Sequence, residues 1–368
     1  MKRKNLKIGL TLQFIVAGAP LMADLFIPQF AEILGATKLE IGILGTVFAL
    51  SMFFSAAIFG RMSDTIGRKK ILFLGFFLAG LFYAISFFSR SFSNFFILRM
   101  LQGISVGIYP GALAAYVNEN NGTMDDYSAY GALGIALFMW VSGVIVNIIK
   151  LRWIFVSVGI LYFISLFLTM HIKEEHIKSI EVPIFPIKVI MKNINLYLAI
   201  FFTFTGITIT WTFWILFLNK LGATPFAAGY ITMINPLFEF LTLKFIANRI
   251  KFRSTGLGIF ILSVSFSLFA FARNPLQLIP LQVFAGMGWA FMYAGSLNDI
   301  MKNNREKGTA TGILQSSISL GYIVGPFVAG LITLIFKDLK YEYLLAGIII
   351  FFGFILLQRK SKKQLSSI

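Results

Sequence analysis

The sequence has little charge. Asp, Glu, Lys and Arg make up 13% of its 368 residues, whereas soluble proteins carry about 25%. Hydrophobic residues reach 58% and the mean hydropathy is +0.83, so the chain lacks the polar surface that keeps a protein dissolved in water. The composition therefore predicts a protein embedded in a lipid bilayer.

Cysteine is absent, and histidine occurs only twice, at His171 and His176. Without cysteine there are no disulfides, thiolate metal sites or cysteine nucleophiles. No carboxylate cluster surrounds the two histidines in the sequence, so we expect no metal site. Neither a phosphate-binding Gly-Lys-Ser/Thr loop nor a His-Glu-x-x-His motif occurs, so we expect no enzymatic activity and no cofactor.

Long apolar runs dominate what is present. Stretches of about 20 residues are needed to cross a bilayer as helices, and twelve such spans lie between polar breaks: 8–31, 39–59, 71–89, 93–117, 127–149, 153–171, 195–219, 226–247, 255–272, 276–298, 309–336 and 341–358. The longest polar break falls mid-chain. We therefore expect an all-α integral membrane protein with two six-helix bundles, at 1–172 and 195–368, joined by a linker at 173–194.

The net charge of +17 does not indicate nucleic-acid binding, because the cations sit in short clusters between apolar spans rather than on one basic face. Alternate loops, counted from the N-terminus, hold 22 of the 32 Lys and Arg, and the intervening loops hold 8. Since cytoplasmic loops are enriched in Lys and Arg, both termini and the linker are predicted to be cytoplasmic, in a plasma-membrane protein.

An internal repeat supports the division into two halves. Leu34-Gly35-Ala36-Thr37, with Gly42 following, recurs 187 residues later as Leu221-Gly222-Ala223-Thr224, with Gly229 following. Both threonines stand where they would cap the second helix of a half. The repeat predicts two halves related by pseudo-twofold symmetry, a design that places a binding site between the repeats.

One polar stretch, Gly60 to Lys70, separates two long apolar spans and holds four cations and the carboxylate of Asp64. We expect a hairpin loop there, with Gly60 and Gly67 providing the turn. Asp64 is predicted to face the start of the eleventh span, where a helix dipole favours a carboxylate. Arg68 is predicted to hold Asp64 or a neighbouring helix end.

The stretch resembles the loop signature of the major facilitator superfamily at Gly60, Ser63, Asp64, Gly67, Arg68, Lys69 and Lys70, although Thr65 and Ile66 replace the usual cation and aromatic residue. Arg99-Met100-Leu101-Gln102-Gly103 and Arg152-Trp153-Ile154-Phe155 are similar to family sequences in helices 4 and 6. The resemblance implies a transporter, a cytoplasmic gate at Gly60, Asp64, Gly67 and Arg68, and a role for Arg99 in tuning protonation. The Gly-Pro-x-x-Gly-Gly signature of drug:proton antiporters is missing from the fifth span, while Gly325 to Gly330 in the eleventh is similar to it.

Ionisable residues inside spans are the strongest candidates for function, because inserting each at the bilayer centre costs about 2.5–3.5 kcal/mol. Asp24 lies between Pro20 and Pro28, which can kink the helix around it; its role is either proton carrier or structural cap. Arg99 either opposes Asp24, grounds the helix backbone, or extends to the membrane surface. Glu239 is predicted to face a cavity, since its spacing from Lys244 disfavours an ion pair.

Polar and aromatic residues at helical spacing are candidates for solute contact. Thr232 and Asn235 share one helix face with Glu239, and further candidates, with packing as the alternative for each, are Trp211, Gln282, Trp289, Tyr293, Gln315 and Tyr322. Such a weakly polar, aromatic cavity suits an amphipathic or lipophilic solute.

Together these patterns predict a secondary transporter that moves a small organic solute by alternating access. We expect proton-coupled efflux of a lipophilic or drug-like compound, driven by the proton gradient through Asp24, Glu239 and Arg99. Proton-coupled symport or facilitated passage of an organic metabolite is an alternative, and a non-transporting membrane receptor or scaffold is an alternative of another class. We expect a monomer whose partners are its solute and the bilayer.

Overall fold

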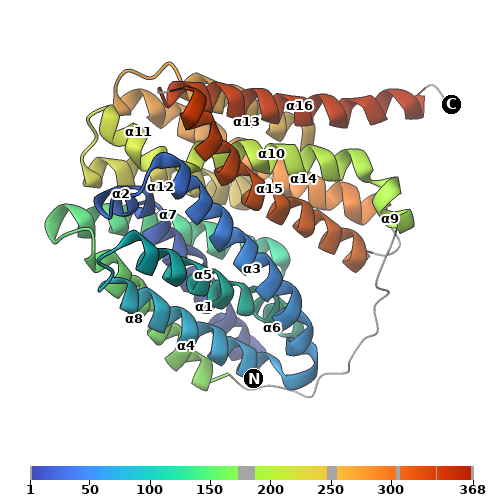
Figure 1. Ribbon diagram of the computed structural model, residues 1–368. Helices are drawn as coiled ribbons and strands as arrows, with labels where there is room; N and C mark the ends of the chain where they lie inside the picture. Colours follow the sequence, from blue (N-terminus) through green and yellow to red (C-terminus); the bar gives the residue numbers. More distant parts are fainter. Residues whose placement is uncertain (1, 173–186, 247–254, 304–306, 337, 366–368) are drawn as a thin grey trace.

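The computed structural model describes residues 2–172, 187–246, 255–303, 307–336 and 338–365, and these residues form helices with no strand among them (Figure 1). Eleven helices in this part of the chain are long and apolar enough to cross a membrane, and a shorter apolar helix spans Thr255–Phe269. The prediction of an all-α membrane protein with twelve spans is confirmed.

Six spans build the N-terminal half. Its helices are α1 (Lys2–Asp24), α2 (Ile27–Ile33), α3 (Lys38–Ile66), α4 (Arg68–Ser86), α5 (Phe92–Ile108), α6 (Pro110–Glu119), α7 (Met124–Ile148) and α8 (Trp153–Met170). The first span consists of α1 and α2, and the fourth of α5 and α6.

The C-terminal half repeats this plan. Its elements are α9 (Ile187–Lys192), α10 (Ile194–Thr212), α11 (Trp214–Lys220), α12 (Pro225–Leu241), the π-helical segment η1 (Thr242–Ile246), α13 (Thr255–Phe269), the 3-10 turn η2 (Pro275–Gln277), α14 (Leu278–Asn303), α15 (Lys307–Ile335) and α16 (Lys340–Leu365). Here α10 and α11 together form one span.

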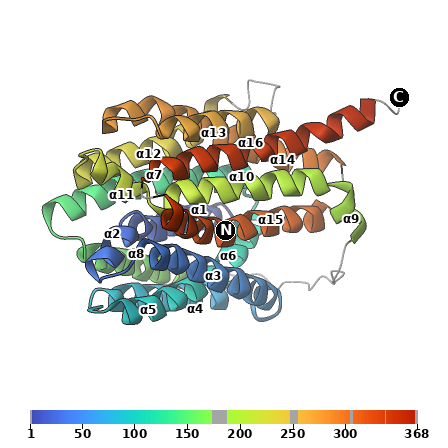
Figure 2. The ribbon, with the colours of Figure 1, turned by 45° about the horizontal axis from the view of Figure 1, so that its top comes forward.

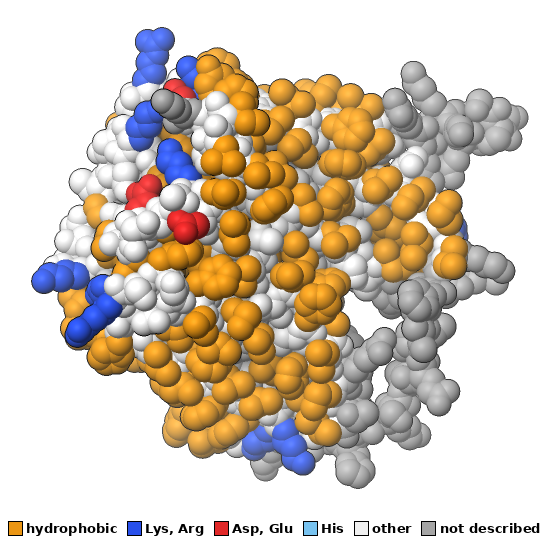
Figure 3. Space-filling view, viewed as in Figure 1, with side chains coloured by type: hydrophobic (Ala, Val, Ile, Leu, Met, Phe, Trp, Pro, Cys, Tyr) orange, Lys and Arg blue, Asp and Glu red, His pale blue; other side chains and the backbone are white. Residues whose placement is uncertain are grey.

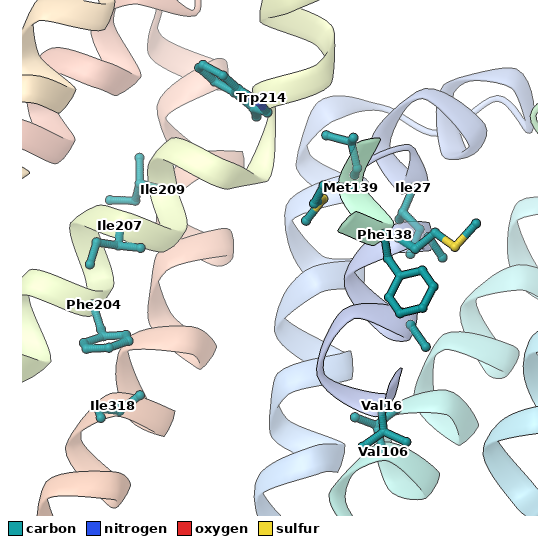
Figure 4. Packing of buried hydrophobic residues seen from close by; sticks show 14 of the residues in the cluster. Val16, Ile27, Val106, Phe138, Met139, Phe204, Ile207, Ile209, Trp214 and Ile318 are labelled. Atoms are coloured by element: carbon teal, nitrogen blue, oxygen red, sulfur yellow. The ribbon is translucent and has the colours of Figure 1, made fainter. Parts of the chain in front are cut away.

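The first, fourth, seventh and tenth spans lie innermost. Their apolar windows are 61, 56, 67 and 56% buried, against 33–44% for the other long spans. The buried hydrophobic residues form one cluster that draws on both halves, with Phe204 and Ile318 on one side and Val16 and Phe138 on the other (Figure 4). The two halves meet along two lines of contact, α3 with α15 and α7 with α12, which we call the two seams.

The first span is interrupted beside Asp24. Helix α1 ends at that residue and α2 begins at Ile27, with Pro28 in its first turn. Proline lacks an N–H and is well tolerated there, so the chain can break just before it. The corresponding span of the C-terminal half breaks at Phe213, which is 187 residues after Phe26. The interruption thus belongs to the repeat.

Glycines hold the seams together at one end of the molecule. A β-carbon on Gly42 would lie 2.9 Å from the Cα of Gly330, and one on Gly229 would lie 2.9 Å from the Cα of Gly143. Gly42 and Gly229 are the repeated glycines, and Gly143 and Gly330 are also 187 residues apart. The repeat therefore encodes two equivalent backbone contacts between the halves, at what we call the glycine end.

The opposite end, which carries the α3–α4 turn, α9 and the C-terminus (Figures 1 and 2), is called the basic end here. The ribbons of the two halves run apart toward it in Figure 1, and hydrophobic side chains cover much of both halves in the same view (Figure 3). Near this end a β-carbon on Gly60 of α3 or Gly312 of α15 would meet no atom within 4 Å. The described residues therefore bring the backbones of the two halves into close contact at the glycine end, and they leave open space beside these two glycines near the basic end.

The polar stretch from Gly60 to Lys70 is not the hairpin loop that the sequence suggests. Helix α3 continues through Gly60 to Ile66, and α4 begins at Arg68. Gly67 alone makes the turn, with φ of 102°, a conformation that glycine adopts without a side-chain clash. Most of the predicted loop is thus the last two turns of a helix.

Candidate transport site

Asp24 and Arg99 form an ion pair within the N-terminal half. Arg99 Nη1 donates to Asp24 Oδ1 at 3.0 Å and to Gln102 Oε1 at 3.0 Å. The Arg99 side chain is 4% exposed and that of Asp24 is 25% exposed, so the arginine does not extend to the membrane surface. Its guanidinium also lies over the ring of Phe48, 3.9 Å from the centroid, a favourable position for a cation.

A short chain of hydrogen bonds ties the pair to α4. Gln102 Nε2 donates to Ser86 Oγ at 2.8 Å, and Ser86 Oγ donates to the carbonyl of Phe82 at 2.8 Å. Gln102 and Ser86 are both fully buried. Buried polar groups are normally hydrogen-bonded. Here the bonds connect the Arg99 guanidinium, through Gln102 and Ser86, to the backbone of α4.

Three buried tyrosines surround the ion pair and were not among the predicted site residues. The hydroxyls of Tyr109 and Tyr162 are 2.9 Å apart, and the rings of Tyr83 and Tyr162 stack with centroids 5.8 Å apart. All three interact electrostatically with Asp24. Their position in apolar spans could have identified them in the sequence. A tyrosine hydroxyl buried there normally needs a hydrogen-bond partner, so it indicates other polar groups nearby.

Glu239 lies in an aromatic environment in the C-terminal half. Trp289 is its polar side-chain neighbour, and Tyr293 and Tyr322 are within electrostatic range. The ring of Phe204 lies 5.1 Å from that of Trp289 and 5.7 Å from that of Tyr322. Three of the predicted residues, Trp289, Tyr293 and Tyr322, are therefore brought together around this carboxylate.

Lys244 does not pair with Glu239. Its Nζ bonds Asp126 Oδ1 of α7 at 3.0 Å, across the seam between the two halves. The π-helical segment that follows α12 carries Lys244 toward the basic end. Glu239 is thus left among aromatic rings, as its spacing from Lys244 suggests.

Tyr322 lies within electrostatic range of both carboxylates, Glu239 and Asp24. It belongs to α15, and its side chain is exposed. Asp24 comes from the N-terminal half and Glu239 from the C-terminal half. The ionisable groups inside the spans therefore gather where the halves face each other, as expected for a site at a repeat interface.

The other predicted contact residues have different surroundings. The hydroxyl of Thr232 accepts from Trp214 Nε1 at 2.8 Å and donates to the carbonyl of Ala228 at 2.6 Å, so in this state it positions the indole. Trp211 packs against the rings of Trp214 and Phe266. Gln315 is exposed on α15.

Asn235 and Gln282 are buried amides with unused hydrogen-bonding groups. Gln282 is fully buried and neither of its amide atoms has a partner within the described structure; the same holds for the side-chain nitrogen of Asn235. Buried polar groups are rarely left unbonded in native proteins. These atoms are available to a polar group of a solute or to water.

At the basic end, Arg68 joins two helix ends. It donates from Nη1 to Ser63 Oγ at 2.7 Å and from Nη2 to Glu119 Oε1 at 3.1 Å. Glu119 is the last residue of α6, which agrees with the expected hold on a neighbouring helix end. The predicted contact of the Asp64 side chain with the start of α15 lies outside the described side chains.

Two six-helix halves in a membrane, with carboxylates from both between them, define the architecture of a secondary transporter. The chain belongs to the Major Facilitator Superfamily, whose sequence model matches residues 9–304 and 196–367. It is therefore a multi-pass membrane transporter of an organic solute, and family and fold indicate no enzyme.

Among curated relatives, Multidrug resistance protein 2 of Bacillus subtilis is 25% identical over 356 residues, covering 89% of this chain and 87% of that protein. Two other relatives match over only 17% and 28% of their own length. Among solved structures, a mutant of the nucleoside transporter NupG has a TM-score of 0.79 at 17% identity, covering 98% and 99% of the two chains. The human organic anion transporter MFSD10 has a TM-score of 0.72 at 16% identity, covering 97% and 99%.

Proposed function

We propose that this protein exports a lipophilic, drug-like organic cation from the cytoplasm in exchange for protons. The observation that carries the proposal is the environment of Glu239, a carboxylate placed among Trp289, Tyr293 and Tyr322. Aromatic faces attract cations, and a carboxylate with no cationic partner among the described residues supplies the opposite charge. The apolar surroundings suit the hydrophobic body of such a solute.

Charge balance argues against an anionic solute. The two cations inside the predicted spans, Arg99 and Lys244, are both paired with carboxylates. Releasing Arg99 to an anionic solute would leave Asp24 and the buried guanidinium without their pairing, which is unfavourable inside a protein, whereas Lys244 lies half exposed near the basic end. Symport or facilitated passage of a neutral organic metabolite remains the alternative, because Asn235 and Gln282 offer unused amide groups.

Asp24 is proposed as the proton carrier. Its carboxylate is one quarter exposed, bonds Arg99, and lies within electrostatic range of Tyr322 in the other half. Taking up a proton would break the ion pair and change the net charge between the two halves. This change would shift the equilibrium between the conformations in which the halves are differently oriented. Glu239 would bind the cation or take a proton in its place.

We also propose an orientation in the membrane, a solute class and an oligomeric state. The excess of Lys and Arg in alternate loops supports a cytoplasmic basic end, with both termini there, in the plasma membrane. The name of the Bacillus subtilis relative supports efflux of a drug-like compound. We further propose that one chain suffices, since both halves of the interface belong to it.

Flux into proteoliposomes tests the function. With the interior acid, a lipophilic cation without titratable groups, such as tetraphenylphosphonium, is expected to accumulate inside, and dissipating the pH gradient should stop accumulation. Glu239→Gln should weaken binding of the cation, whereas Asp24→Asn should abolish the dependence on the gradient. Accumulation that ignores the gradient in the unmodified protein, or flux only of neutral metabolites in the same direction as protons, would refute proton-coupled export.

A further inference from the structure

Two polar atoms beside the Asp24–Arg99 ion pair have no hydrogen-bond partner among the described residues. They are Nε of Arg99 and the hydroxyl of Tyr83. Both residues are buried: Arg99 is 3% exposed and Tyr83 is 0% exposed. Tyr83 belongs to α4, and its hydroxyl lies within side-chain hydrogen-bonding range of Arg99 and within electrostatic range of Asp24. The hydroxyl thus lies close to the guanidinium without making a hydrogen bond of good geometry to it.

The arrangement matters because Arg99 stays charged whatever happens to Asp24. Arginine is not deprotonated in proteins, and a buried cation that loses its partner is strongly unfavourable. If Asp24 becomes neutral, the bond to Gln102 is the one side-chain hydrogen bond that Arg99 retains among those described. A second acceptor within reach would stabilise this state.

The other groups near Asp24 are less suited to that task. Tyr109 and Tyr162 are bonded to each other, and Tyr109 also donates to the carbonyl of Val16 at 3.3 Å. Tyr322 belongs to α15 of the other half and is exposed. Tyr83 is held in place by stacking on Tyr162, with 23° between the ring planes, and its hydroxyl is unused.

We propose that Tyr83 is a positioning residue that accepts a hydrogen bond from Arg99 when Asp24 is neutral. The inference rests on the proposed proton coupling and adds to it a defined second partner for the cation. In the charged state Arg99 bonds Asp24 and Gln102, and in the neutral state it bonds Tyr83 and Gln102. The ion pair can then open without leaving the guanidinium unbonded.

The pH dependence of transport in proteoliposomes tests this inference with Tyr83→Phe, which keeps the ring and removes only the hydroxyl. Loss of the second partner disfavours the state with neutral Asp24, so more acid is needed to reach it. A hydrogen bond to a charged group is equivalent to about one pH unit of a protonation equilibrium. The pH at the midpoint of the transport profile is therefore expected to fall by about one unit. Binding of tetraphenylphosphonium at neutral pH should not change.

Tyr343→Phe is the matched control, since Tyr343 is also buried with an unpartnered hydroxyl, but in the C-terminal half and next to Glu342. It should leave the midpoint in place. An unchanged midpoint in Tyr83→Phe, or an equal shift in the control, would overturn the inference. The double variant with Asp24→Asn should show no further effect of Tyr83→Phe. A wild-type pH profile in Asp24→Asn alone would instead overturn the proton coupling itself.

Discussion

Gly42 of α3 and Gly330 of α15 touch through their backbones: a β-carbon on Gly42 would lie 2.5 Å from the carbonyl oxygen of Pro326 and 2.9 Å from the Cα of Gly330. Thr46, one turn further along α3, donates to the carbonyl of Ile323 at 3.0 Å. The halves are therefore joined at the glycine end by main-chain contacts, which any side chain larger than hydrogen would disturb.

Replacing Gly42 with alanine is expected to open the glycine end. Forcing an extra methyl group into a packed contact costs about 1–3 kcal/mol, so the closed state should lose roughly fivefold or more in population. Because the chain has no cysteine, a single cysteine introduced at Thr46 can report access by its rate of maleimide labelling. That rate should rise in Gly42→Ala. Gly312→Ala, whose β-carbon would meet nothing within 4 Å, should leave labelling unchanged; a rise there would argue against the contact as the cause.

The Asp126–Lys244 ion pair closes one seam at the basic end. Its side chains are 39% and 49% exposed, and exposed pairs contribute about 0–1 kcal/mol. Asp126→Asn or Lys244→Gln should therefore increase the open population at the basic end at most about fivefold. Distance measurement between spin labels on α7 and α12 can follow this change. Exchanging the two charges should restore the original distance distribution, and failure to do so would exclude a purely electrostatic bridge.

The end of α3 is predicted to act as a gate through Asp64 and Arg68. Asp64→Asn should slow transport while leaving equilibrium binding of tetraphenylphosphonium nearly unchanged, because the residue lies in the last turn of α3 at the basic end. Glu119→Gln, which removes the charge partner of Arg68, should also slow transport and leave binding nearly unchanged, but with a smaller loss of rate. Lost binding with a normal transport rate in Asp64→Asn would refute the gate.

Asp338, between α15 and α16, gives a pH-dependent contribution to stability. Its hydrogen bond with Lys220, at 2.9 Å, holds the pKa of this carboxyl below its usual value. Since the native pKa is lowered, the contribution is present at neutral pH and is lost as the pH falls through the native value. Asp338→Asn should lower the unfolding temperature slightly at pH 7, since exposed pairs contribute about 0–1 kcal/mol, and not at about pH 3. An equal difference at both values would mean that charge is not the cause.

Much of the fold could be predicted from the sequence because the membrane imposes simple rules. A span needs about 20 apolar residues, and its backbone must be helical to satisfy its own hydrogen bonds. Pro28 likewise predicts a local disturbance near Asp24. The repeat of Gly42 and Gly229 can be seen in the sequence, but the role of these glycines in joining the halves cannot. Gly42 contacts Gly330 and Gly229 contacts Gly143, and neither contact is between the two repeated glycines.

The candidate site was less predictable. Asp24, Arg99 and Glu239 stood out because charge is rare within spans. Tyr83, Tyr109 and Tyr162 did not, because tyrosines are common in a chain this rich in aromatic residues. For Thr232, helical spacing identifies a face of α12 but not the side chain that lies against it, which is Trp214.

The sequence by itself determined the class of protein and the number of spans, and it singled out the ionisable groups inside those spans, since burying charge in lipid is costly at any position along the chain. Only the tertiary structure decided which of these groups are paired. Arg99 neutralises Asp24, Lys244 crosses to Asp126, and Glu239 remains among aromatic rings. Pairing depends on distances of a few ångströms between helices far apart in sequence, and those distances are set by how the two halves pack.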